Sequence, residues 1–150
     1  LGIRMDITNR LRRSPLSCLV GDDDDAVRDA VVEILDAWGF RTLTASSGED
    51  ALRILLCEPI DFSILDVEMP SMTGIEVIER YLTGPWIAAA TSPPQRAPTP
   101  RRMPTIFMSG NRSEEVRRAA ESVGITFLDK PIEVRRMRSA VDRLLADHLS

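Results

Sequence analysis

The hydrophobic residues of this chain fall into short apolar runs that alternate with longer stretches of helical spacing. Five of the runs have the length of buried strands, and polar or turn-forming residues follow each of them. The expected strands are residues 17–21, 41–45, 60–65, 105–108 and 125–128. Because strands that alternate with helices pair in parallel, this pattern predicts an α/β domain.

Between the strands, apolar residues recur three and four positions apart, which is the spacing of one helix face. Asp24 and Asp25 are expected to start the first helix, where acidic side chains interact favourably with the helix dipole, and Gly39 to end it. The later helices are expected at 48–57, 74–82, 113–122 and 132–149. Side chains expected to face the core include Val31, Leu35, Trp38, Ala51, Leu52, Leu55, Val77, Val134, Met137, Val141 and Leu144.

Each right-handed crossover between parallel strands places a helix over one face of the sheet. Five such units predict a doubly wound, five-stranded parallel sheet of the flavodoxin-like type, with strand order 2-1-3-4-5 and helices on both faces. In this order the first and third strands are neighbours at the centre. Ligands of such sheets bind outside the carboxyl ends of the strands, so acidic residues placed there are candidates for chemistry.

Two segments lie outside the regular pattern. Residues 1–16 contain four arginines among polar residues, and a loosely docked basic tail is expected there. Residues 84–104 contain six prolines, a density that no helix tolerates, so an extended insertion is expected. The rest of residues 17–150 is expected to form one domain with a single core.

Composition narrows the possible functions. The 19 basic and 23 acidic residues give a net charge of −4, which does not favour nucleic-acid binding. The sequence has neither a run of 18 apolar residues nor a signal-peptide core, which predicts a cytoplasmic protein without a membrane span. Cys18 and Cys57 lack metal-binding spacing and are expected to be buried free thiols, and His148 is expected to be a solvated helix-end residue.

Three carboxylates are expected to meet where the first and third strands end. Asp22 and Asp23 follow the first strand, and Asp66 follows the third, before a loop broken by Pro70 and Gly74. Three like charges in one crevice repel one another unless a hard cation lies among them. Because oxygen ligands with open water positions suit Mg²⁺, the sequence predicts a magnesium site.

The two remaining strand ends also carry polar groups. In chain order, the signals are Asp22-Asp23, Asp66 with Met69-Pro70 and Gly74, Ser109, and Lys130-Pro131. Taken together at these spacings, they resemble the receiver domain of bacterial two-component response regulators of the chemotaxis type. The resemblance extends from residue 17 to about residue 149.

The resemblance implies a role for each of these residues. Asp66 would accept the phosphoryl group, and Mg²⁺ would lie among Asp22, Asp23, Asp66 and the backbone carbonyl of Glu68. Ser109 and Lys130 would contact the phosphoryl oxygens. An aspartate is a competent nucleophile once a metal and a cation neutralise the oxygens around phosphorus. The expected protein is a signalling phosphoacceptor and not an enzyme, and a structural ion pair for Lys130 is compatible with this role.

The resemblance also implies a switch and its partners. A histidine kinase or phosphotransfer protein would supply the phosphoryl group, and Ser109 would then move toward it. The family usually has a tyrosine where this chain has Phe127, which offers no hydroxyl. Output is expected through the fourth helix, fifth strand and fifth helix, to an effector protein or a second copy of the chain. Further departures are Gly21 in the first strand and Glu68, an added carboxylate at the mouth of the pocket.

Two other functions remain open. A pseudo-receiver would keep the fold as an interaction module without phosphoryl transfer. A phosphatase of the haloacid-dehalogenase type also uses a strand-end aspartate with an acid two residues further on, as in Asp66-Val67-Glu68. Against the phosphatase, its nucleophile is expected on the first strand. A single-domain regulator and a part of a longer one are both consistent with the sequence.

Overall fold

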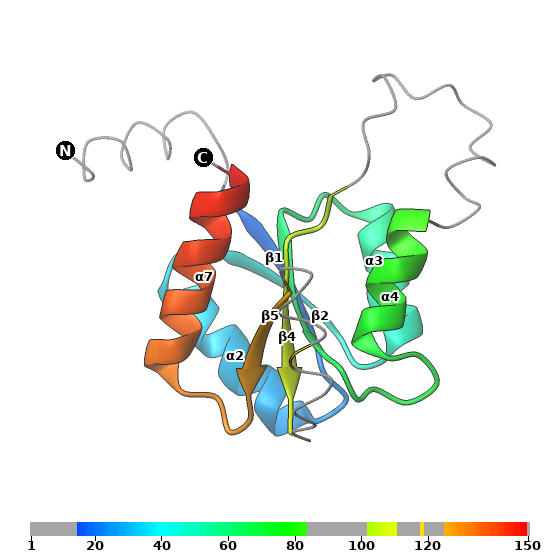
Figure 1. Cartoon of the computed structure of the whole chain (residues 1–150), viewed down its shortest axis with the longest axis horizontal. Helices are drawn as coiled ribbons and strands as arrows, with labels where there is room; N and C mark the ends of the chain where they lie inside the picture. Colours follow the sequence, from blue (N-terminus) through cyan, green and yellow to red (C-terminus); the bar gives the residue numbers. More distant parts are fainter. Residues whose placement is uncertain (1–14, 84–101, 111–117, 119–124, 150) are drawn as a thin grey trace.

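The computed structural model describes residues 15–83, 102–110, 118 and 125–149. The expected tail at 1–16, the proline-rich insertion at 84–104 and the helix at 113–122 lie largely outside these residues. The described elements are β1 (Ser17–Gly21), α2 (Asp25–Ala37), β2 (Arg41–Ala45), α3 (Gly48–Cys57), β3 (Phe62–Asp66), α4 (Gly74–Thr83), β4 (Thr105–Ser109), β5 (Thr126–Asp129) and α7 (Val134–Leu149). Up to β4, strands and helices therefore alternate as the pattern predicted, and β5 and α7 complete the described order (Figure 1).

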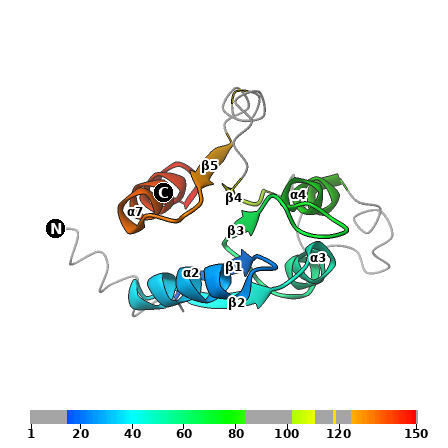
Figure 2. The ribbon, with the colours of Figure 1, turned by 90° about the horizontal axis from the view of Figure 1, so that it is seen from below.

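The sheet has the predicted topology. Its strands run in the order β2-β1-β3-β4-β5, and every neighbouring pair is parallel. Seen along the strands, α2 and α7 cover one face, and α3 and α4 cover the other (Figure 2). The doubly wound fold with β1 and β3 at its centre is confirmed.

Alternation along the strands separates the core into two clusters. One cluster packs beneath α2 and α7, and the other beneath α3 and α4. Strand residues of the first cluster are Cys18, Val20, Phe62, Ile64, Ile106, Met108 and Leu128. Those of the second are Leu19, Ala45, Leu65 and Phe107, with Leu43 and Phe127 packed against them. Because side chains alternate between faces, residues 22, 66 and 130 fall on the α2–α7 side, and residue 109 on the α3–α4 side.

Some element boundaries differ from the prediction. β3 begins at Phe62, two residues after the expected start. Asp61, just before it, forms hydrogen bonds with the first residue of β1. The Asp61 carboxylate accepts a hydrogen bond from the Ser17 backbone N–H at 2.7 Å, and the Asp61 N–H donates to the Ser17 carbonyl at 2.9 Å. α7 begins at Val134, two residues later than expected.

Two burial predictions are wrong. Cys57 is exposed because Ala51, Ile54 and Leu55 fill the inward face of α3, and a residue two positions beyond Leu55 points about 200° away. Val134 is 53% exposed at the first residue of α7, where Met137, Ala140 and Val141 make the inward face instead. Cys18 is buried as expected, and burial raises the pKa of its thiol.

The first helix starts and ends as the sequence indicated. Asp24 is the N-cap of α2, and its side chain accepts hydrogen bonds from the backbone N–H groups of Ala26 and Val27. Asp25 lies in the first turn, and Gly39, with φ of 91°, follows the helix end. Because Asp24 provides the cap, Asp22 and Asp23 are not required for it.

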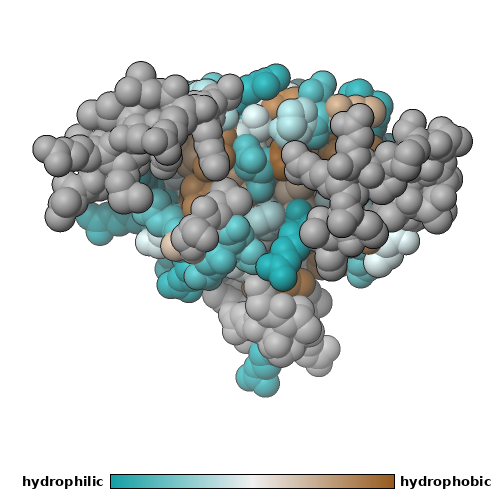
Figure 3. Space-filling model, turned by 90° about the horizontal axis from the view of Figure 1, so that it is seen from above, coloured by the Kyte–Doolittle hydropathy of each residue, from teal (hydrophilic) through white to brown (hydrophobic). Residues whose placement is uncertain are grey.

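The strands begin at one end of the molecule and finish at the other. The face at which the strands begin shows hydrophilic residues interspersed with hydrophobic ones over its described part (Figure 3). The carboxyl ends of the strands lie on the opposite face, seen in Figure 2. Within the described ranges, no helix combines the length and apolarity needed to cross a lipid bilayer.

Candidate functional site

Backbone hydrogen bonds fix the positions of the strand-end residues. The Asp22 N–H donates to the Ala45 carbonyl of β2 at 3.0 Å, and the Lys130 N–H donates to the Ser109 carbonyl of β4 at 2.9 Å. Val67, directly after Asp66, donates its N–H to the Met108 carbonyl at 2.9 Å. These bonds continue the hydrogen-bond ladder of the sheet beyond the strand ends, so the backbone that carries the Asp22, Asp66 and Lys130 side chains is held in place.

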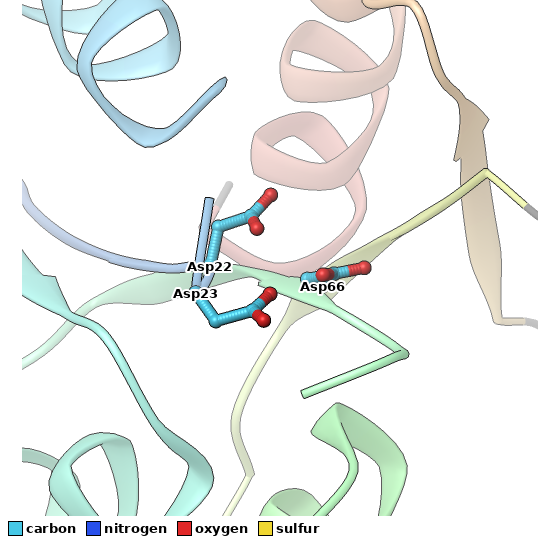
Figure 4. Close-up of side chains that lie close together, drawn as sticks. All are labelled: Asp22, Asp23 and Asp66. Carbon is cyan, nitrogen blue, oxygen red and sulfur yellow. The ribbon is translucent and has the colours of Figure 1, made fainter. Parts of the chain in front are cut away.

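Three carboxylates meet at this edge, as expected. β1 and β3 pair Gly21 with Leu65, and continuing that register places Asp22 beside Asp66. Carboxylate oxygens of Asp22, Asp23 and Asp66 all lie within 4.8 Å of one another (Figure 4). Asp22 is fully buried and Asp66 is 3% exposed, whereas Asp23 is open to solvent. The cluster is therefore a pocket with two buried acids and a third at its mouth.

The two Asp22 oxygens have different environments. Oδ1 accepts a hydrogen bond from the Asp24 backbone N–H at 2.9 Å. Oδ2 is buried and forms no hydrogen bond with the residues that the structure describes. It lies 2.9 Å from Lys130 Nζ, so this contact is an ion pair whose angles do not make it a hydrogen bond. Asp22 Oδ2 thus has the Lys130 charge beside it and keeps lone pairs that an additional ligand can bind.

Lys130 provides the positive charge of the pocket. Its Nζ lies 2.9 Å from Asp22 Oδ2 and 3.2 Å from Asp66 Oδ2, and its side chain is 20% exposed. Burial lowers the pKa of Lys130, but the close contact with Asp22 and the charges of Asp66 and Asp22 outweigh burial, so the net shift is upward. The Lys130-Pro131 peptide bond, whose isomer the sequence left undecided, is cis.

Asp66 carries an energetically costly charge. Burial raises its pKa, and so does the neighbouring charge of Asp22, whereas the Glu68 N–H and Lys130 lower it without reversing the net upward shift. Its Oδ1 accepts the Glu68 backbone N–H at 3.2 Å. A carboxylate held in this way gains stability from any cation that enters the pocket.

The loop after β3 is held by two close backbone approaches. A Cβ atom at Gly74 would collide with the Asp66 carbonyl, and one at Gly48 would collide with the Met72 carbonyl. Ser71, with φ of 68°, makes the turn between them. The absence of a side chain at Gly74 and Gly48 thus allows the loop to pass directly behind Asp66 and to touch the start of α3.

Ser109 and Glu68 meet across the rim of the pocket. The Ser109 hydroxyl donates a hydrogen bond to Glu68 Oε1 at 3.3 Å. The sequence placed each residue near the pocket but gave no signal that they contact each other. Phe127 is partly buried, and its ring lies 5.9 Å from that of Phe107 on β4.

Arg28 belongs to the site although its sequence position did not predict it. Arg28 Nη1 donates to the Asp22 carbonyl at 2.9 Å, and its Nη2 pairs with Asp25 Oδ1 at 2.6 Å. The Arg28 side chain is only 15% exposed. The signal was the three-residue spacing of Asp25 and Arg28 on one helix face, which indicates a pair but not the additional contact with Asp22.

Comparison with known proteins identifies the class of domain. Residues 18–142 match the family of response regulator receiver domains. Since the match covers most of the chain, the chain belongs to this family. This confirms the resemblance inferred from the strand-end residues.

Similar proteins carry this domain in different settings. The chain is 25% identical over 134 residues to a cyclic di-GMP phosphodiesterase of Thermotoga maritima, covering 89% of this chain and 32% of that protein. It is 25% identical over 128 residues to sporulation initiation phosphotransferase F of Bacillus subtilis, covering 85% of this chain and 91% of that protein. The chain spans 28% of the regulator AfsQ1 of Streptomyces coelicolor and 17% of RpfC of Xanthomonas campestris. It therefore corresponds to a minor part of several curated relatives.

Solved structures agree with the fold. The chemotaxis protein CheY4 of Vibrio cholerae superposes with a TM-score of 0.68 at 25% identity, covering 87% of this chain and 99% of that one. A putative response regulator from Chloroflexus aurantiacus superposes with a TM-score of 0.70 at 25% identity, covering 88% and 98% of the two chains.

The donor set fits a hard divalent cation. Three carboxylates have oxygens within 4.8 Å of one another, and one of these acids, Asp22, has a buried oxygen without a hydrogen bond from the described residues. No soft ligand belongs to this cluster, and oxygen-only sets suit Mg²⁺. Asp23, at the mouth, leaves one side of the pocket open to solvent.

Replacing Asp66 with asparagine should stabilise the metal-free protein at neutral pH by on the order of 1 kcal/mol, a common size for a stabilising substitution. The reason is that the pKa of Asp66 is raised in the folded state, so its ionisation lowers stability as pH rises through the folded-state value. The gain should shrink as pH falls toward the ordinary aspartate pKa of 3.8 and should vanish below it, where both states bind the proton. Urea unfolding with a chelator, at neutral and acidic pH, measures both effects. The exposed Asp29→Asn variant is the control, and equal effects of the two substitutions would contradict the interpretation.

Proposed function

We propose that this chain is a phosphoacceptor receiver domain in which Asp66 receives a phosphoryl group in a Mg²⁺-dependent reaction. The observation that carries the proposal is the ion-paired pocket: Lys130 Nζ lies between the buried carboxylates of Asp22 and Asp66, at 2.9 and 3.2 Å. Membership of the receiver family supports the same reading.

In the proposed reaction, an Asp66 carboxylate oxygen attacks phosphorus. The bond from phosphorus to the leaving group breaks, and the leaving group departs with the electron pair. The donor is a phosphohistidine of a kinase or phosphotransfer protein, or a small acyl phosphate. The products are an aspartyl phosphate and the freed leaving group, so atoms and charge balance.

The residues around Asp66 prepare it for this attack. The Glu68 N–H, bound to Asp66 Oδ1, holds one carboxylate oxygen in place. Lys130 offsets negative charge at Oδ2 and, as a flexible point charge, can follow the oxygens of the incoming group. The Ser109 hydroxyl, on the adjacent strand end, donates to a phosphoryl oxygen after transfer.

Asp22, Asp23 and Asp66, with the backbone carbonyl of Glu68, would hold Mg²⁺. The bound ion would neutralise charge on the oxygens that crowd around phosphorus. Asp22 contributes its buried, non-hydrogen-bonded oxygen, and Arg28 keeps the Asp22 backbone in position.

The proposed output surface is the face of β5 and α7. A hollow of about 320 Å³ lies between these elements, lined by Phe127, Leu128, Asp129 and three arginines of α7, Arg135, Arg136 and Arg143. Ser109 and Phe127 fall on adjacent strands next to this face, so movement of Ser109 reaches it first. The partner would be an effector protein or a second copy of the chain.

The first test is covalent labelling. With Mg²⁺ and acetyl phosphate, the parent protein should gain one hydroxylamine-labile phosphoryl group, and Asp66→Asn should gain none. Intact-mass spectrometry measures the gain, and the exposed Glu58→Gln variant should label like the parent. If Asp66→Asn labels as well as the parent does, the assignment of the acceptor is wrong. A parent protein that never labels would favour the pseudo-receiver alternative.

The second test concerns the metal. Asp22→Asn and Asp23→Asn should each weaken Mg²⁺ binding by at least about tenfold, the lower end of the loss when even an outer partner of a metal site is removed. Titration calorimetry measures the affinity, and circular dichroism checks that the fold persists. Asp29→Asn controls for the loss of one acidic charge. Unchanged affinity in both pocket variants would rule out the site.

The third test follows the switch. Beryllofluoride, a mimic of the phosphoryl group, should alter hydrogen exchange in peptides from β5 and the first turns of α7. The same treatment should leave α3 unchanged and should have no effect on Asp66→Asn. Changes restricted to α2 or α3 would contradict the proposed output face.

A further inference from the structure

The contact between Glu68 and Ser109 is the feature of the site that the proposed reaction does not use. The Ser109 hydroxyl donates to Glu68 Oε1 at 3.3 Å. Ser109 is 9% exposed, whereas the Glu68 residue is open to solvent. The two residues are 41 positions apart and meet only because β3 and β4 end side by side.

Glu68 is fixed near Asp66 by its own backbone. Its N–H donates to Asp66 Oδ1 at 3.2 Å, so its side chain begins at the wall of the pocket. Val67, one residue earlier, is tied to the Met108 carbonyl at the end of β4, the residue before Ser109. The backbone from which the Glu68 carboxylate extends toward Ser109 is therefore held by hydrogen bonds to Asp66 and Met108.

A serine hydroxyl carries one proton and donates it to one acceptor at a time. In this structure the acceptor is a carboxylate, which binds a donor more strongly than a neutral oxygen does. After phosphorylation of Asp66, the proposed acceptor is a phosphoryl oxygen. The two acceptors compete for the same proton, and the Glu68 bond must break before the second bond forms.

We propose that Glu68 is a positioning residue that holds Ser109 in its resting orientation and so biases the domain against the activated state. The inference rests on the proposed function of Asp66. Its energetic effect has two sources, the hydrogen bond to Ser109 and the repulsion between the Glu68 carboxylate and the incoming phosphoryl group. Only the first source requires Ser109.

A double-mutant cycle separates these two sources. The measured quantity is beryllofluoride affinity at saturating Mg²⁺, for the parent, Glu68→Ala, Ser109→Ala and the double variant. With Ser109 intact, the Glu68→Ala variant should bind beryllofluoride roughly five- to tenfold more tightly than the parent does. In the Ser109→Ala background the gain should fall to less than about half of that, because only charge repulsion is left to remove.

Glu68→Gln and Glu79→Ala serve as matched controls. Glu68→Gln keeps an oxygen acceptor without the charge, so its gain should be smaller than that of Glu68→Ala. Glu79 is an exposed acid on α4, and its removal should change beryllofluoride affinity little. Equal gains from Glu68→Ala with and without the Ser109 hydroxyl, or no gain at all, would overturn the proposal.

A second measurement does not depend on phosphoryl chemistry. Three-bond proton couplings of Ser109 report its side-chain rotamer in the ligand-free protein. They should show one dominant rotamer in the parent and a different distribution of rotamers in Glu68→Ala. Averaged couplings in the parent would overturn the role of Glu68 even if beryllofluoride binds. Failure of the parent to bind beryllofluoride while the rotamer effect persists would contradict the proposed function of Asp66 instead.

Discussion

The mutual repulsion of buried carboxylates is the constraint on which the rest of this structure depends. Asp22 and Asp66 are side by side because β1 and β3 pair in parallel at the centre of the sheet. Lys130, directly after β5 and three strands away from β1, offsets their charge, and its own position depends on a backbone bond to Ser109. The sheet thus brings the repelling groups together and also supplies the cation that makes their proximity tolerable.

Sequence alone predicted the sheet order and the pocket acids because both follow from rules that act along the chain. Strand ends are visible as apolar runs that stop at polar residues, and parallel pairing brings those ends to one edge. These sequence rules do not predict which rotamer each side chain adopts. The Arg28 contact with Asp22 and the Glu68 contact with Ser109 depend on side-chain torsions that no spacing encodes. Cys57 and Val134 were misplaced because they lie at helix ends, where the periodic pattern has too few neighbours to determine a face.

Family membership identifies the type of domain but leaves open the system in which it works. The chain spans about a third or less of relatives named as a phosphodiesterase, a transcriptional regulator and a sensory protein. It spans most of a phosphotransferase from Bacillus subtilis. A fold that serves such different proteins must deliver its signal through surfaces and not through the pocket itself. In the proposed function, the arginine-lined hollow beside β5 is the surface through which this chain would reach its partner.

The division of the core into two clusters has a consequence for how the domain can vary. By strand alternation, Asp22, Asp66 and Lys130 belong to the α2–α7 side of the sheet, whereas Ser109 and Phe127 belong to the α3–α4 side. In the proposed function, the acceptor and its cation are therefore anchored in one layer, and the residues that respond to phosphorylation are anchored in the other. The two sets of side chains meet at the carboxyl edge of the sheet, beyond the strand ends, so the packing of each layer can vary separately in related proteins while that edge is kept.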